Sequence, residues 1–208
     1  MANLPIEVMC IGHDKFVSVE NAIYFLNKYQ DAFKFKLLRD TKWENFQGTN
    51  ENYFTTKEIY NFLEDVSKEL KGYHPYIIGV LVDRLNGDYF CNLFGSMQEY
   101  PDIKKLTGKS VISTWKINEM LDPIPVDVYI VFEFLSLSMQ FVIGQNLIHD
   151  ERRMCVFDRK VNRIDIVPIL SKCKFCDSCT KQIVNLLDND QRMAINHIIN
   201  KINLTVSH

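Results

Sequence analysis

Soft metal ligands are concentrated in one short stretch of this 208-residue chain, HDERRMC followed by a spacer and CKFCDSC. His149 and Cys155 open the stretch, and Cys176 and Cys179 close it as a pair separated by two residues. Three thiolates and one imidazole fill all four positions of a tetrahedral zinc ion and leave no place for water or substrate. The spacing therefore predicts one structural Zn2+ bound by His149, Cys155, Cys176 and Cys179.

Each of these residues also has a simpler interpretation. His149 could be a surface histidine at the negative end of a helix, and Cys155 could be a small buried hydrophobic residue. Cys173 is a spare thiol, which either replaces His149 as the fourth ligand or stays free. A redox-active CxxC is disfavoured, because we do not expect the segment to follow a strand and open a helix in a thioredoxin-like unit.

The bulk composition gives no sign of a nucleic-acid or membrane protein. Lys and Arg number 24 against 26 Asp and Glu, and an apolar content of 47% suffices for a single sizeable core. The opening MANLPIEVMCIG has the pattern of a strand and lacks that of a secretory signal. The six cysteines do not form a disulfide framework. Together these features predict a cytoplasmic protein with reduced thiols.

Strand and helix patterns alternate along the chain, which predicts one α/β (α+β) domain over residues 1–208 with a mixed twisted sheet. The expected strands are 6–12, 33–40, 76–83 and 110–117. A further strand is expected between 76–83 and 110–117, after the Asn86-Gly87 turn and through Phe94. The expected helices are 18–33, one from Thr55 or Thr56 to about Leu70 with Glu58 in a capping box, 126 to near His149, and 191–203. The last of these has Met193, Ile195, Ile198, Ile199 and Ile202 on its apolar side.

The segment 126–148 is apolar enough to resemble a membrane span. It contains five polar or charged residues that hydrocarbon tolerates poorly, namely Asp127, Glu133, Gln140, Gln145 and Asn146. We therefore interpret it as a buried central helix and expect no membrane partner.

Two phrases of the chain resemble the archaemetzincin family of zinc peptidases, over residues 5–182. The phrase YIIGVLVDRLNGDYFCNLFGSM, followed by SVISTWKI, is similar to the family's order of a strand ending in Asp, a strand ending in Phe-Gly and a third near a Val-Ser pair. The second phrase is the cysteine segment. In the family, an HExxHxxGxxHC motif runs into a further cysteine and a later CxxC, and these cysteines hold a second, structural zinc. The resemblance implies a zincin-like fold with a zinc-clamped C-terminal segment.

The catalytic half of that family motif is degenerate here when His149 is taken as its third histidine. The other positions carry Met139 and Ile143 for the histidines, Gln140 for the glutamate, Asn146 for the glycine and Asp150 for the cysteine. A zincin needs two imidazoles one helical turn apart and a carboxylate base. The structural-zinc half persists in Cys155 and in a CxxC at either Cys176–Cys179 or Cys173–Cys176. The resemblance therefore implies a protease fold without protease chemistry.

These observations favour a catalytically inactive metzincin-like protein that binds another protein or a peptide, or has a regulatory role. One alternative is an active zinc hydrolase that uses His149 with Glu151 or Asp150, one thiol and a water in an open position. The other is a nucleic-acid-binding zinc module, because residues 152–181 contain eight basic and three acidic residues. The absence of interleaved aromatic residues there counts against single-strand binding.

Overall fold

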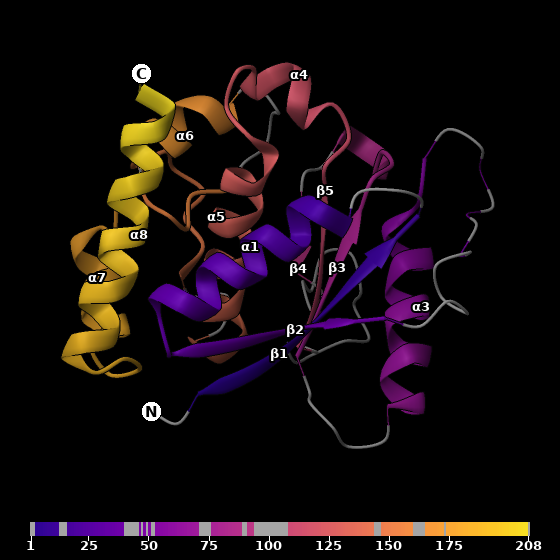
Figure 1. The fold of residues 1–208 in the computed structure, drawn as a ribbon, viewed down its shortest axis with the longest axis horizontal. Helices are drawn as coiled ribbons and strands as arrows, with labels where there is room; N and C mark the ends of the chain where they lie inside the picture. The colour runs from indigo at the N-terminus through magenta and orange to yellow at the C-terminus, as the bar shows by residue number, and fades with distance from the viewer. Residues whose placement is uncertain are drawn as a thin grey trace.

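The structure is a computed structural model of the chain, and it describes residues 3–12, 16–39, 46, 48, 50, 53–70, 76–88, 91–93, 108–143, 147–159, 165–172 and 174–207. Its strands are β1 (Leu4–Ile11), β2 (Phe33–Leu38), β3 (Ile77–Leu81), β4 (Cys91–Leu93) and β5 (Lys109–Ser113). Its helices are α1 (Phe16–Tyr29), α3 (Thr56–Glu69), the short η1 (Asn86–Asp88), α4 (Ile117–Leu121), α5 (Val126–Ile143), α6 (Ile166–Lys172), α7 (Asp177–Ile183) and α8 (Asn189–Ser207) (Figure 1).

The strands form one mixed sheet in the order β2-β1-β3-β5-β4. Neighbouring strands are parallel, except that β4 runs antiparallel to β5. This confirms the predicted mixed sheet with packed helices. On the edge strand β2 the side chains alternate, with Phe33 and Phe35 buried and Lys34 and Lys36 exposed. Lysines on an edge strand discourage pairing with a further chain.

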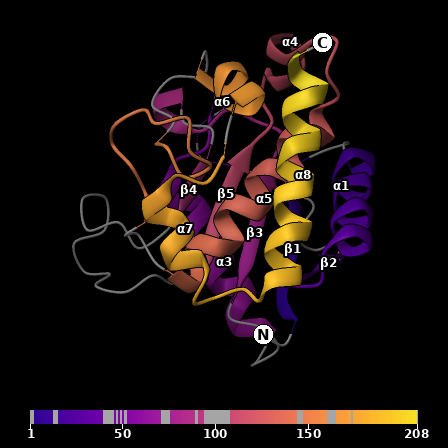
Figure 2. The same ribbon diagram turned by 90° about the vertical axis from the view of Figure 1, so that its left-hand side faces the viewer.

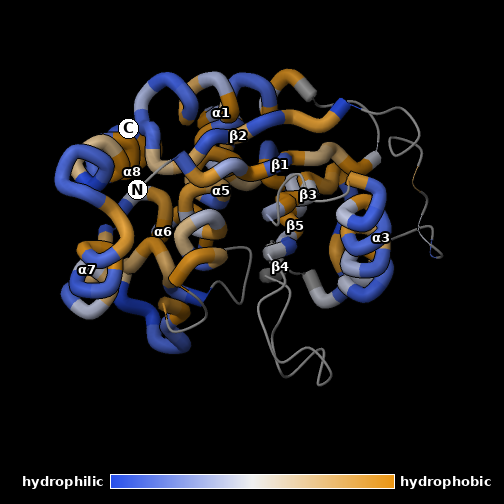
Figure 3. The backbone as a smooth tube through the Cα atoms, turned by 90° about the horizontal axis from the view of Figure 1, so that it is seen from below, coloured by the Kyte–Doolittle hydropathy of each residue, from blue (hydrophilic) through white to orange (hydrophobic). Residues whose placement is uncertain are grey.

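Helices cover both faces of the sheet (Figure 3). One face packs against α3 through a core that includes Ile59, Leu63 and Val66. The opposite face packs against α1 and α5, and this larger core continues into α6, α7 and α8. Figure 2 shows α8 running beside α5 and α1 on that side. The molecule is therefore layered, and its C-terminal helices extend the layer that contains α5.

The central helix α5 is apolar on all sides, and 78% of its 18 residues are buried. By length and composition it could cross a membrane, but here it lies between the sheet, α1 and the C-terminal helices. The predicted buried central helix is confirmed. Its described part ends at Ile143, and residues 144–146 lie outside the described residues.

The helix α3 starts where the sequence predicted it, at Thr55 and Thr56. Thr55 is the N-cap, and its side chain accepts a hydrogen bond from the N–H of Glu58. The Glu58 carboxylate in turn accepts a bond from the N–H of Thr55, at 2.7 Å. The predicted capping box is confirmed.

Three predicted boundaries are wrong, because local hydrogen bonds and a backbone turn end or start the elements at other residues. The first helix ends at Tyr29, because the side chain of Gln30 bonds the backbone of Phe33, the first residue of β2. The third strand, predicted over 110–117, ends at Ser113, because the chain turns at Lys116, with φ 57°, into α4. The C-terminal helix extends beyond 191–203, because Asp188 and Gln191 bond each other's backbone N–H and start it at Asn189. Met193, predicted on the apolar side, is 64% exposed.

Candidate metal centre

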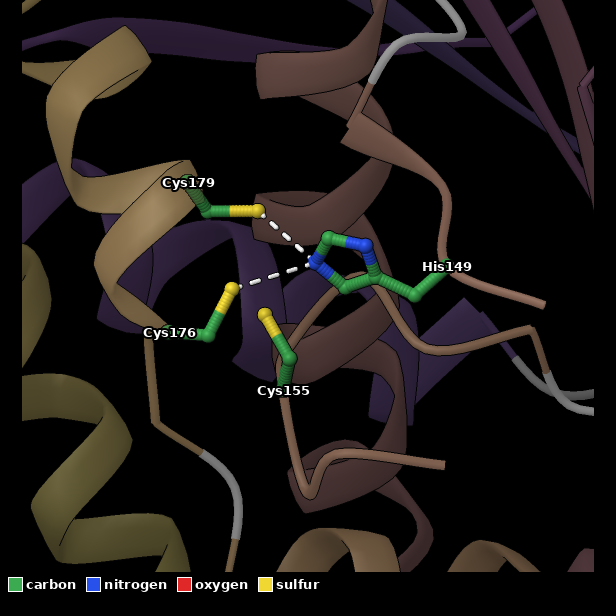
Figure 4. A group of neighbouring side chains, drawn as sticks. All are labelled: His149, Cys155, Cys176 and Cys179. Carbon is green, nitrogen blue, oxygen red and sulfur yellow. Dashed lines mark hydrogen bonds between the residues drawn. The ribbon is translucent and has the colours of Figure 1, made fainter. Parts of the chain in front are cut away.

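The structure brings the four predicted ligands together. The donor atoms of His149, Cys155, Cys176 and Cys179 all lie within 4.8 Å of one another (Figure 4). Nε2 of His149 lies 3.0 Å from Sγ of Cys179 and 3.2 Å from Sγ of Cys176. Neighbouring donors around a tetrahedral zinc are about 3.5–3.8 Å apart. The four residues therefore form a possible zinc site, which small side-chain rotations would complete. Cys173, the alternative ligand, lies outside the described residues.

Two of the ligands come from the start of α7. Cys176 is the N-cap residue, with extended backbone, and Cys179 lies in the first turn. Residues three apart on a helix share a face, so both thiols point the same way. The CxxC therefore opens a helix, but the element described before it is α6 and not a strand, so the expectation that it does not form a thioredoxin-like strand–helix unit is not contradicted. The positive end of the helix dipole favours thiolates at this position.

The other two ligands come from the segment 147–159, which follows α5. The N–H of His149 donates to the carbonyl of Phe157 at 3.1 Å, and that of Arg159 donates to the carbonyl of His149 at 2.8 Å. Cys155 forms an isolated β-bridge with Lys174, two residues before Cys176. The backbone thus holds the two halves of the site together independently of any metal.

Asp158 organises the turn that carries Cys155. From the sequence it counted only as one of three acidic residues in 152–181 and was given no role. It is 3% exposed, and its Oδ2 accepts hydrogen bonds from the N–H of Arg153 at 2.7 Å and of Cys155 at 3.0 Å. Met154, between those two donors, has a positive φ of 54°. An aspartate three residues after the cysteine is a signal that could have revealed this turn, because Asp side chains commonly bond nearby backbone N–H groups.

The three thiols differ in their electrostatic surroundings. Burial raises the pKa of Cys155, and burial together with the neighbouring thiols raises that of Cys179. Burial also acts to raise the pKa of Cys176, but hydrogen bonds from the Ser178 hydroxyl, the Cys179 N–H and the two other thiols outweigh it and lower this pKa from 9.0 to about 6. Three thiolates this close repel one another, so a divalent cation between them is electrostatically favourable.

In protein stripped of metal, we expect Cys176 to react with iodoacetamide well before Cys155 and Cys179. Its thiolate predominates above a pKa of about 6, and the thiolate is the nucleophile. The rate should be nearly flat from pH 7 to 8 and fall about tenfold per pH unit well below pH 6, as the thiolate is protonated. Peptide mapping by mass spectrometry follows each cysteine separately. Equal rates for Cys176 and Cys179 would contradict the prediction.

The positions that the resemblance assigns to catalysis are built into the protein core. Met139 is fully buried in the larger core, and Ile143 packs against it. The side-chain amide of Gln140 donates to the carbonyl of Ser136 at 3.2 Å and lies 3.0 Å from its hydroxyl. Asn146 lies outside the described residues. These side chains serve the packing of α5.

The acidic residues of the alternative hydrolase site point elsewhere. The side chains of Asp150 and Glu151 are 84% and 83% exposed, and they pair with Arg159 and Arg153. Within the described parts of the chain, the group that could hold a metal contains neither of them.

Three of the eight basic residues on the face that suggested nucleic-acid binding form ion pairs with acidic residues. Asp150 and Glu151 offset Arg159 and Arg153, and Arg152 forms an ion pair with Asp165. Lys160 and Arg163, which also belong to the predicted basic face, lie outside the described residues.

A comparison with solved structures finds a similar fold in archaemetzincin from Methanopyrus kandleri, with a TM-score of 0.54 and 17% sequence identity. The match covers 88% of this chain and 96% of that chain. Neither protein-family models nor curated proteins match the sequence. At this identity the likeness concerns the fold, so the chain has a zincin-like fold similar to that of archaemetzincin.

Proposed function

We propose that this chain is a catalytically inactive, metzincin-like protein that holds one structural zinc and works as a protein-binding or regulatory module. The observation that carries the proposal is the convergence of four protein donors, His149, Cys155, Cys176 and Cys179, within 4.8 Å. A zinc ion with four protein ligands has no open position at which to activate water, which is the arrangement of structural sites.

In this proposal the metal staples the start of α7 to the segment that follows α5. His149 and Cys155 belong to that segment, Cys176 is the N-cap of α7 and Cys179 lies in its first turn. Zinc supplies positive charge to three close thiolates, and its binding free energy then contributes to folding. The exposed residues Asp150 and Glu151, which flank the site, are engaged with arginines and take no part in the cluster.

Two features support the absence of peptidase chemistry. Met139 and Gln140 stand where the resemblance places a zinc ligand and the general base, and neither side chain can take that role. The Gln140 amide is also occupied by Ser136. In this proposal the fold can bind a partner, but it lacks the zinc ligands and the general base that zincin-type peptide hydrolysis requires.

We further propose a protein or peptide as the partner and the cytoplasm as the location. β4 stands at the end of the strand order beside β5, and an edge strand can bind an extended peptide by main-chain pairing without catalytic residues. Reduced cysteines suit a metal site in a reducing compartment. The arginine ion pairs described above favour a protein partner over nucleic acid.

Zinc stoichiometry on the purified protein, combined with X-ray absorption at the zinc edge, tests the proposal. We expect one zinc per chain, coordinated by three sulfurs and one nitrogen. An oxygen ligand with an open position, or a second zinc, would contradict a structural site and favour an enzyme. A zinc content near zero would overturn the metal site itself.

A further inference from the structure

The three sulfurs of the cluster are not equally accessible to solvent. Cys155 and Cys179 are fully buried, whereas Cys176 is partly exposed at the start of α7. The hydroxyl of Ser178, an exposed residue, lies 3.1 Å from Sγ of Cys176. A small oxidant arriving from solvent therefore meets Cys176 first, and a buried thiol, that of Cys179, stands one helical turn behind it.

We propose that Cys176 and Cys179 form a dithiol that peroxide oxidises to a disulfide, and that this oxidation releases the zinc. The inference rests on the proposed zinc site and adds a means of regulating it. Reactive cysteines that respond to peroxide are solvent-accessible and have a resolving cysteine beside them, and this pair has both properties.

The oxidant is hydrogen peroxide, and the chemistry balances in two steps. The Cys176 thiolate attacks one peroxide oxygen, so that an S–O bond forms, the O–O bond breaks and the departing hydroxide takes a proton to become water. The Cys179 thiolate then attacks the Cys176 sulfur, so that an S–S bond forms and the S–O bond breaks, with a second hydroxide leaving as water after protonation. Two electrons pass from the sulfurs to the peroxide.

Cys179 is the better resolving residue because it shares a helical turn with Cys176. Cys176 is the N-cap residue, so its side chain can rotate toward Cys179 while α7 stays intact. Cys155 is fixed in a separate segment by its β-bridge to Lys174 and by the Asp158 carboxylate, which accepts a hydrogen bond from the N–H of Cys155. The Cys155 thiol is also within hydrogen-bond reach of Cys176, so a disulfide between Cys155 and Cys176 is the competing product that the experiment must distinguish.

The disulfide removes two of the four zinc ligands. His149 and Cys155 remain, and two ligands are too few for a stable zinc site. Oxidation would thus free the metal and release the staple between α7 and the segment 147–159. Reduction of the disulfide would restore both thiolates, so the change is reversible.

The experiment treats the zinc-loaded full chain with hydrogen peroxide and follows zinc with a colorimetric chelator. Trypsin cuts after Lys174 and Lys181, so one peptide, FCDSCTK, contains both cysteines and no other. We expect this peptide to lose the mass of two hydrogens at the same rate as zinc appears, with one zinc released per disulfide. Dithiothreitol should reverse both changes.

Controls separate this inference from the function on which it rests. The variant Cys173→Ser should release zinc as the unmodified chain does, because the proposed pair excludes Cys173. If the protein has no zinc before peroxide is added, the proposed function fails. If zinc is present but stays bound after Cys176 is oxidised, or leaves while Cys176 crosslinks to Cys155 or Cys173, the proposed function stands and the disulfide mechanism is overturned.

Discussion

The variant Cys176→Ser is expected to lose zinc and thermal stability together. A serine hydroxyl is a poor zinc ligand, and the three remaining donors cannot hold the ion as four can. A metal whose free concentration is about 100 to 1,000 times its dissociation constant stabilises the folded protein by about 3–4 kcal/mol. For a chain of this length that loss corresponds to a fall in Tm of roughly 6–16 °C. Zinc content and calorimetry on the same samples measure both effects.

The matched control is Cys173→Ser, three residues earlier in the same segment. It should keep one zinc and an unchanged Tm if His149 is the fourth ligand. Chelation of the unmodified protein should reproduce the Tm of Cys176→Ser, and the variant itself should not respond to chelator. If Cys173→Ser loses zinc while His149→Ala keeps it, the fourth ligand is Cys173 and the site must be reassigned.

Hydrogen exchange should show where the stability is lost. The segment 147–159 and α7 are joined through the backbone pairing of Cys155 with Lys174 and, in our proposal, through zinc. Removing the metal should therefore accelerate exchange in these two regions. The central strands β1 and β3, which pair with neighbours on both sides, should keep their protection. A uniform increase across the sheet would mean that the zinc supports the whole fold.

Features encoded by neighbouring residues could be predicted from the sequence. The capping box of Thr55 and Glu58 involves residues three apart, and its bonds form wherever that turn forms. The four proposed ligands were also identifiable, because three thiols and an imidazole crowded into one segment match the donor set of a structural zinc. We could predict that these four residues converge without knowing how the strands are arranged in the sheet.

The ends of several elements could not be predicted from hydrophobic spacing. Helical spacing continues past Tyr29, and only the bonds from Gln30 to the backbone of Phe33 show that the chain turns into β2 there. Met193 was predicted on the apolar side of α8, yet it is exposed. Which residues of that side are buried depends on how α8 packs against the rest of the protein, and the spacing alone does not reveal this. The helix that begins after Cys176 is seven residues long, too short for periodicity to reveal.

Introducing the zincin motif should damage this protein and not activate it. The triple variant Met139→His, Gln140→Glu, Ile143→His places an imidazole in a fully buried core position and replaces the Gln140 amide that donates to Ser136. Loss of the Met139 side chain from the core costs about 2–5 kcal/mol, and a buried polar group without a partner costs about 1–3 kcal/mol more. Since domains are typically stable by only about 5–15 kcal/mol, we expect a large fall in Tm or partial unfolding, and no peptide hydrolysis.

The single variants locate the cause of that damage. Met139→Leu conserves volume and polarity in the core and should cost less than about 1.5 kcal/mol, whereas Met139→His alone should account for most of the loss in the triple variant. Both single variants should keep the one zinc, because Met139 is not among the four converging donors. A triple variant that stays folded, binds a second zinc and hydrolyses a peptide would show that α5 can present a catalytic face. The buried packing of Met139 leads us to expect the opposite, because a side chain with no exposed surface has no room to turn toward a metal bound at the surface of α5.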